Sequence, residues 1–200
     1  MSSPSSSQLD SLAAKLSSSN ISDMATSLAS DPQVNALWKE VPDGGPYQSL
    51  VTDAKRPDPV RFAAALVLLS KRADAFWKIE RPVLAQVFAT ALQKDLARWS
   101  YPWGWLWASP GDPVGTLGRI FVEIGPPALP ALKALLNDAS SRSAYIGSEE
   151  ATEMAMKRYR VKDFAAFYIS RIMNLELPWE QNLAKRDEAI DRLHKQLPSG

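Results

Sequence analysis

The chain has 200 residues, 46% of them hydrophobic, and its 23 basic and 22 acidic side chains give a formal net charge of +1. This size and composition predict one globular domain, with or without an additional arm. The balanced charge argues against nucleic acid or an anionic membrane as the main partner. Because the sequence contains no cysteine, it excludes disulfides, thiolate metal sites and cysteine nucleophiles.

Residues 1–8 are rich in serine and include a proline, which predicts a flexible leader. The leader has neither a basic nor an apolar segment, so we expect no signal peptide. The longest apolar run, Phe62–Leu69, is far shorter than the roughly 20 residues that cross a bilayer, and integral membrane association is not expected. The compartment stays open, with the cytoplasm as the default and an exported or lipid-anchored protein as the alternative if a leader was removed.

Residues 9–56 are predicted to form short helices, because their apolar residues recur at intervals of three and four. Asp31 followed by Pro32 supplies a helix cap and a proline in the first turn. The Pro- and Gly-rich stretch 42–46 interrupts the pattern, and a further short helix is expected from about Tyr47.

Longer helices are expected from residue 57 onward, and three of them start in a similar way. They begin at Pro59, Pro113 and Arg160, and each is followed by a break and a second amphipathic helix. The run after Pro59 is apolar on all sides, which is typical of a helix packed on more than one face. Pairs of helices that recur at a period of about 50 residues indicate stacked helical hairpins.

A small residue occupies a similar place in each of the three first helices, namely Ala64, Gly118 and Ala166. A small side chain allows two helices to approach closely. The coincidence therefore predicts tight helix packing at these positions.

The segment 117–138 resembles a HEAT-like repeat. Its first helix ends at Ile124-Gly125, its second begins with prolines and carries a leucine stripe, and the unit closes at Asn137-Asp138. Residues 160–166 look like the start of another such unit. The resemblance implies an all-α fold of about three HEAT-like hairpins over residues 57–198, stacked as a short right-handed solenoid that residues 9–56 cap. A compact helical bundle is the alternative, and a repeat fold by itself does not define a function.

The stretch Arg98–Trp107 reads RWSYPWGWLW and holds four of the seven tryptophans. Pro102 and Gly104 argue against a helix through its centre. In an extended conformation one face would carry an aromatic strip. The strip consists of Tyr101, Trp103, Trp105 and Trp107. Three interpretations remain open: a loop that fills a small core, a binding platform for a peptide, sugar or other apolar ligand, and a membrane-interface segment.

A second candidate feature is an acidic turn after Ser148 that includes Glu149 and Glu150. Negative charge is favourable at the start of a helix, so a solvated helix start explains this turn without acid–base chemistry. The turn lies between the second and third predicted hairpins, and the aromatic strip lies between the first and second. Insertions at equivalent points of a repeat project from the same edge. We therefore expect the strip and the acidic turn to form one binding surface.

Motifs for catalysis and metal binding are scarce. The lone histidine, His194, has no partner set that points to a base or a ligand, and residues 111–118 lack the spacing and the lysine of a phosphate-binding loop. The basic stretch 157–162, which includes Tyr159, could bind phosphates, but cations that compensate helix ends explain it better. We therefore expect no catalytic residue, metal or cofactor.

These patterns predict a non-enzymatic helical-repeat interaction module that presents an aromatic surface to a protein or peptide partner. The main alternative is an exported or lipid-tethered ligand-binding domain that uses the Trp-rich loop as a platform. A helical domain that accompanies a cofactor enzyme also remains open. Nucleic acid is not expected as a partner, and the identity of the partner and the oligomeric state are left open.

Overall fold

The computed structural model describes residues 5–97, 107, 115–141, 158–178 and 182–197. Within these residues every regular element is a helix, which confirms the all-α prediction, and the β-type pairing recorded there is an isolated bridge between Ser141 and Arg160. None of the helices in this part of the chain is both long and apolar enough to traverse a bilayer. The chain forms two compact units, Met1–Arg98 and Trp99–Gly200.

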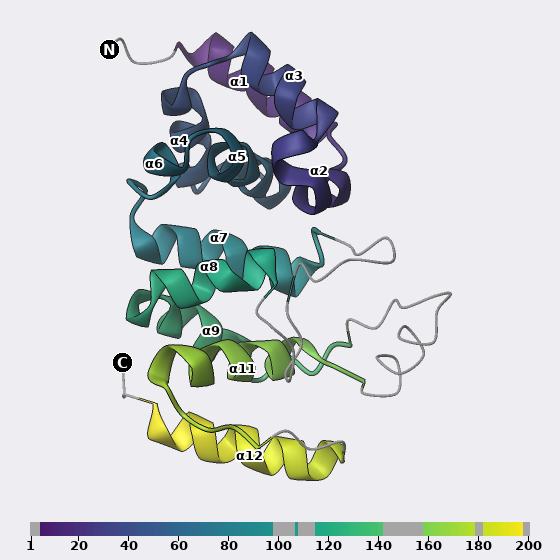
Figure 1. Ribbon diagram of the computed structural model, residues 1–200, viewed down its shortest axis with the longest axis vertical. Helices are drawn as coiled ribbons and strands as arrows, with labels where there is room; N and C mark the ends of the chain where they lie inside the picture. The colour runs from purple at the N-terminus through teal and green to yellow at the C-terminus, as the bar shows by residue number, and fades with distance from the viewer. Residues whose placement is uncertain (1–4, 98–106, 108–114, 142–157, 179–181, 198–200) are drawn as a thin grey trace. The chain divides into compact units, whose positions relative to one another are not determined.

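The first unit contains seven α-helices and one 3₁₀ turn in its described part (Figure 1). They are α1 (Ser6–Ser17), α2 (Ile21–Ser27), η1 (Leu28–Ser30), α3 (Pro32–Glu40), α4 (Gly44–Thr52), α5 (Asp58–Lys71), α6 (Ala73–Phe76) and α7 (Arg81–Lys94). The Asp31 carboxylate accepts a hydrogen bond from the Val34 amide at 2.9 Å, so the predicted cap of α3 is confirmed. Helix α1 starts inside the predicted flexible leader, because Ser5 and Gln8 form a reciprocal capping box.

Helix α5 is the centre of the first unit. Its residues Phe62–Leu68 are all fully buried, and it packs against α1, α2, α3, α4, α6 and α7. This arrangement explains why its sequence is apolar on all sides. The boundary predicted between residues 56 and 57 falls inside this unit, because α5 contacts the helices on both sides of that point.

Helices α5 and α7 run antiparallel, as expected for the first predicted hairpin. Asp58 at the start of α5 forms an ion pair with Lys94 at the end of α7. Phe62 and Phe88 pack edge to face between the two helices, with their ring centroids 5.3 Å apart.

The described part of the second unit contains α8 (Thr116–Ile124), η2 (Pro126–Ala128), α9 (Leu129–Leu135), α11 (Val161–Met173) and α12 (Leu183–Gln196). Helix α8 ends at Gly125, whose φ of 75° is a left-handed conformation that glycine adopts readily. The chain then reverses direction into α9 (Figure 1). Helix α11 packs against α8, α9 and α12 and is the centre of this unit.

The predicted role of the small residues is clearest at Gly118. A Cβ atom added there would lie 2.5 Å from the hydroxyl oxygen of Tyr168 on α11, closer than any stable contact. Tyr168 is itself fully buried. Glycine at this position therefore allows α8 to lie directly on the tyrosine ring. Ala64 and Ala166 are also fully buried, on α5 and α11.

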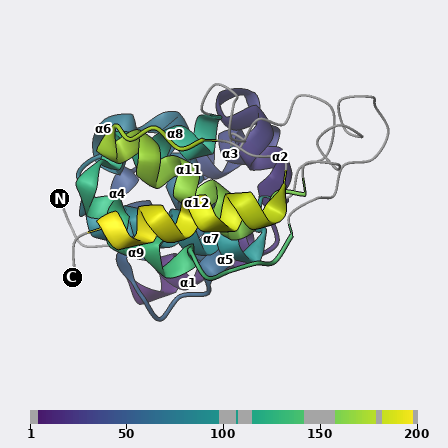
Figure 2. The same cartoon turned by 90° about the horizontal axis from the view of Figure 1, so that it is seen from below.

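The prediction of a third hairpin is wrong, because the two helices of a hairpin run antiparallel, whereas α11 and α12 run parallel. Arg160 at the start of α11 contacts Asp187 in the first turns of α12, and Arg186 beside it contacts Asp163 in the first turn of α11. Figures 1 and 2 show both helices beginning on the same side, with the connection passing back along α11.

The length of the connection explains this parallel arrangement. Helix α11 has 13 residues and is about 20 Å long. Residues 174–182, between the two helices, can span about 30 Å when extended. The chain is therefore long enough to return to the start of α11 before α12 begins.

Candidate functional site

The structure describes one of the six predicted site residues, Trp107. The other five predicted residues lie outside the described part of the chain. They are Tyr101, Trp103, Trp105, Glu149 and Glu150. What the structure does establish is how the segments that carry these residues are attached to the second unit.

Trp107 is partly buried and belongs to an aromatic column in the second unit. Its ring centroid lies 6.2 Å from that of Phe121 on α8, and Phe121 lies 5.1 Å from Tyr168 on α11. Phe121 and Tyr168 are both fully buried. The last tryptophan of the Trp-rich stretch therefore packs against the core of the unit.

The segment that holds Glu149 and Glu150 leaves and rejoins the unit at adjacent points. Ser141, after α9, forms an antiparallel bridge with Arg160, immediately before α11. The amide of Val161 donates to the carbonyl of Ser140 at 3.0 Å. These backbone contacts fix both ends of the segment against each other.

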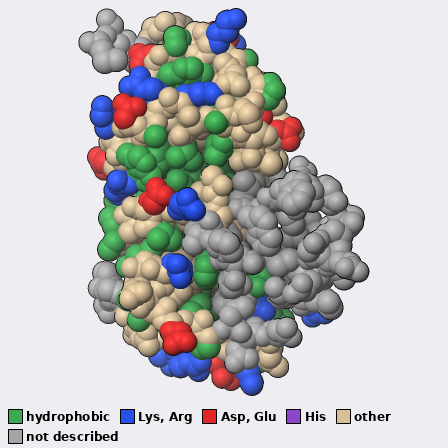
Figure 3. Space-filling model, viewed as in Figure 1, with side chains coloured by type: hydrophobic (Ala, Val, Ile, Leu, Met, Phe, Trp, Pro, Cys, Tyr) green, Lys and Arg blue, Asp and Glu red, His purple; other side chains and the backbone are tan. Residues whose placement is uncertain are grey.

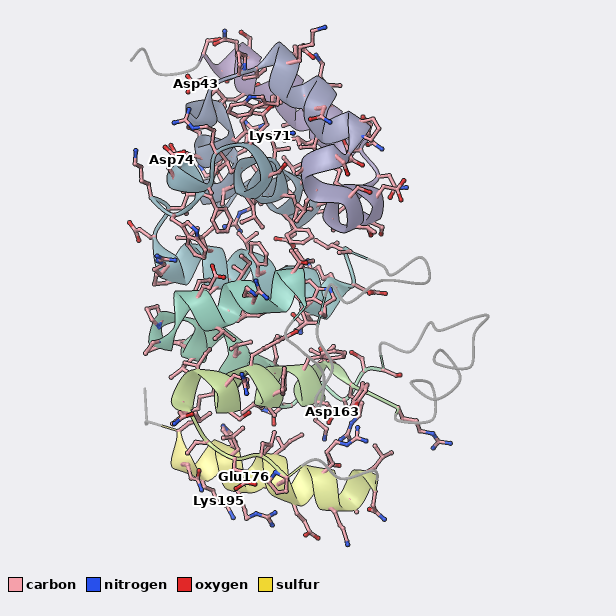
Figure 4. All side chains as sticks on the ribbon, in the orientation of Figure 1. Asp43, Lys71, Asp74, Asp163, Glu176 and Lys195 are labelled. Atoms are coloured by element: carbon pink, nitrogen blue, oxygen red, sulfur yellow. The ribbon has the colours of Figure 1, made fainter. Side chains whose placement is uncertain are left out.

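Five charged residues surround the start of α11, and we call them the ionic cluster. They are Arg160, Lys162, Asp163, Arg186 and Asp187. Their contacts are short: Arg160 lies 2.9 Å from Asp163 and 2.7 Å from Asp187, Lys162 lies 2.8 Å from Asp187, and Arg186 lies 2.9 Å from Asp163. Figure 4 shows Asp163 on the side of α11 that faces α12.

The centre of the ionic cluster is inaccessible to solvent. The side chain of Asp163 is 0% exposed and that of Arg186 is 1% exposed, and the Arg186 guanidinium also stacks over the Tyr159 ring at 5.3 Å. Hydrogen bonds from Arg160 and Lys162 lower the pKa of Asp187 against the opposing effect of burial. Burial lowers the pKa of Arg160, but its hydrogen bonds to Asp163 and Asp187 outweigh this and raise it.

The ionic cluster accounts for part of the basic stretch noted in the sequence. Arg160 and Lys162 bind carboxylates of α11 and α12, and Tyr159 is buried beneath Arg186. These groups are therefore used to join helices. The local part of the cluster had a signal in the sequence, because Arg160 and Asp163 lie three residues apart at the start of a helix. Its contacts with α12 had no such signal.

The attachment points of the two candidate segments lie at the same end of the second unit. Helix α8 begins at Thr116, after the Trp-rich stretch, and α11 begins at Val161, after the segment with the acidic turn. Figures 1 and 2 show both helices beginning on the same side of the unit. The expectation that the two segments form one binding surface concerns residues outside the described part of the chain, and it stays a prediction.

Four other features were considered as sites: the histidine, groups of metal-ligating side chains, a surface cavity and the surface charges. His194 lies exposed on α12, and no group of three or more His, Asp or Glu side chains in the described ranges could hold a metal ion. A shallow cavity of about 310 Å³ lies beside α1 and the end of α3 and includes the Lys15–Glu40 ion pair. On the face of the molecule that Figure 3 shows, acidic and basic side chains of the described residues are interspersed, without a large patch of one sign.

Comparisons of the chain with models of protein families, with curated proteins and with solved structures find no match. The HEAT-like resemblance of residues 117–138 therefore stays a prediction from the motif. What supports a function for this chain is the geometry of its own second unit.

Proposed function

We propose that the chain is a non-enzymatic helical-repeat interaction module that presents an aromatic surface to a protein or peptide partner. In this proposal the α5–α7 pair and the α8–α9 turn are HEAT-like hairpins of a short solenoid, and the parallel α11–α12 pair closes it. The residues proposed to contact the partner are Tyr101, Trp103, Trp105, Glu149 and Glu150, while Trp107, predicted with them, is held on Phe121.

The observation that carries the proposal is the shared attachment of the two segments at the end where α8 and α11 begin. Trp107 is anchored on Phe121, and the Ser141–Arg160 bridge closes the base of the other segment. Anchoring a segment at its ends reduces the conformational entropy that binding must overcome. Tryptophan and tyrosine supply much of the binding energy in many interfaces.

The paired charges also favour an interaction module. Asp163 and Arg186 are buried and bound to each other, so their charges serve the packing of α11 against α12. The interspersed surface charges favour a partner recognised by aromatic contact, with Glu149 and Glu150 selecting basic side chains at the rim.

The test is a selection of random peptides displayed on phage against the full chain, followed by measurement of Kd for the selected peptides. The Trp103→Ala, Trp105→Ala double variant should weaken binding by at least tenfold, which corresponds to about 1.4 kcal/mol. The matched control is Trp38→Ala, because Trp38 stacks on Tyr47 in the first unit, 5.9 Å away. The control should keep Kd within twofold. Failure to select peptides, or equal binding by both variants, contradicts the proposal.

A thermal melt of the same double variant separates binding from packing. Removal of a well-buried tryptophan costs about 3–5 kcal/mol. At this chain length each kcal/mol lowers the midpoint by about 2–4 °C. We expect an unchanged midpoint, whereas a fall of about 10 °C or more assigns these rings to a core. A Glu149→Gln, Glu150→Gln variant should selectively weaken peptides that carry Lys or Arg.

A further inference from the structure

Helix α12 has a narrow apolar contact with the rest of the second unit. Among the described helices it packs mainly against α11. Of its 14 residues, the buried apolar ones are Ala189, Ile190 and Leu193. Leu197, just after the helix, is also buried. These apolar residues begin at the seventh residue of α12, so the start of the helix docks mainly through the polar contacts of Arg186 and Asp187.

These polar contacts join the starts of the two helices. Arg186 reaches from α12 to the buried Asp163, and Asp187 of α12 accepts from Arg160 and Lys162. A buried charge that loses its partner is strongly unfavourable. Arg186 therefore favours two states: fully docked on Asp163, or withdrawn from α11 into water.

The parallel arrangement of α11 and α12 makes the ionic cluster more important for holding the two helices together. Two helices that begin side by side bring together ends of like partial charge, which repel each other. Asp163 lies in the first turn of α11 and offsets part of that repulsion, while α12 has no acidic residue in its first turn. Screening or removing the charges of the ionic cluster weakens the docking of α12 in particular.

Helix α11 is capped at both ends without help from α12. At its start Asp163 accepts from the Arg160 amide at 2.8 Å and from the Arg160 guanidinium at 2.9 Å. At its end Asn174 adopts a left-handed conformation, and the Leu175 amide donates to the Ser170 carbonyl at 2.8 Å. When α12 leaves, Asp163 therefore keeps a cationic partner and α11 keeps its termini.

We propose that α12 is a detachable helix, which the ionic cluster holds on α11 and which leaves as a unit while α8, α9 and α11 stay folded. The connection 174–182 permits this movement, because its extended length of about 30 Å exceeds that of α11. Ionic strength controls the release through Asp187, whose side chain is 40% exposed and therefore open to screening by salt.

The test is hydrogen–deuterium exchange of the full chain, read peptide by peptide. In Arg186→Met the amides of residues 184–196 should exchange at least tenfold faster, while those of α8 and of α5 stay unchanged. Raising the salt concentration from about 0.05 to 1 M should accelerate the same α12 amides in the wild type. The matched control is Lys94→Met, which breaks the exposed Asp58–Lys94 pair in the first unit and should leave α12 unaffected.

A second variant covers the case in which Arg186→Met fails to fold. Asp187→Asn removes the partly exposed carboxylate and leaves the buried Asp163–Arg186 pair intact. It should produce a smaller acceleration that is confined to α12. Exchange of α12 at the wild-type rate in the variants, or acceleration of α11 and α12 together, overturns the proposal. The measurement does not involve peptide binding, so its outcome is separate from that of the proposed function.

Discussion

Replacement of Gly118 by alanine should destabilise the protein, although alanine is usually the better helix former. The new Cβ would lie 2.5 Å from the Tyr168 hydroxyl oxygen, 2.7 Å from Cε1 and 2.8 Å from Cζ. Tyr168 is fully buried, and its ring lies 5.1 Å from that of Phe121. The ring cannot yield without displacing α8 or α11.

The size of the effect follows from two opposing contributions. Overpacking of a core costs about 1–3 kcal/mol, and the upper half of that range applies because the obstacle is a buried ring close to the helix backbone. Alanine regains about 1 kcal/mol over glycine in a helix interior. The net loss is about 1–2 kcal/mol, which lowers the thermal midpoint by about 2–8 °C at this chain length.

The assay is thermal unfolding followed by circular dichroism, with Gly45→Ala in α4 as the matched control. A Cβ atom at residue 45 would lie 3.6 Å from the nearest atom, which is an ordinary contact. The control should melt within about 2 °C of the wild type or slightly above it. A Gly118→Ala variant as stable as the wild type would refute the close approach of α8 to Tyr168.

Three further predictions concern hydrogen bonds and titration. Tyr47→Phe removes the bond from the Tyr47 hydroxyl to the Leu37 carbonyl, 2.9 Å long, and should lower the free energy of unfolding in urea by about 1 kcal/mol. Burial raises the pKa of Tyr47 and Tyr168 above the ordinary 10.0. Unfolded tyrosine therefore ionises first, and urea titrations from pH 8 to 11 should show stability that is constant below about pH 10 and falls above it, less steeply in Tyr47→Phe. The hydrogen bond from Arg72 lowers the pKa of Asp74 to about 2. The contribution of the Arg72–Asp74 hydrogen bond to stability is present above about pH 4 and is lost as the pH falls through 2. An NMR titration of the Arg72→Gln variant should show the pKa of Asp74 rising toward 3.8.

Local signals in the sequence were sufficient for much of the fold. The Asp31-Pro32 cap and the Gly125-Pro126 break were correctly predicted, because capping and backbone conformation depend on neighbouring residues. The all-round apolarity of α5 correctly indicated a helix surrounded by others. Gly118 was correctly interpreted as a point of close packing.

The direction of α12 relative to α11 could not be predicted in this way. Helical periodicity and caps define where a helix begins and ends, but they do not define the direction in which the next helix runs. The ionic cluster illustrates this, because Arg160 and Asp187 are far apart in sequence and 2.7 Å apart in space. For the candidate site, the sequence indicated the two segments, and the structure adds the packing of Trp107 on Phe121 and the Ser141–Arg160 bridge.

The parallel course of α11 and α12 has a practical consequence for experiments on immobilised protein. Since α8, α11 and α12 all begin at one end of the second unit, α12 finishes at the opposite end (Figures 1 and 2). A biotin or affinity handle fused after Gly200 would thus attach the unit to a sensor chip by the far side. The end of the unit at which α8 and α11 begin would face the solution, whereas coupling through surface lysines would give mixed orientations.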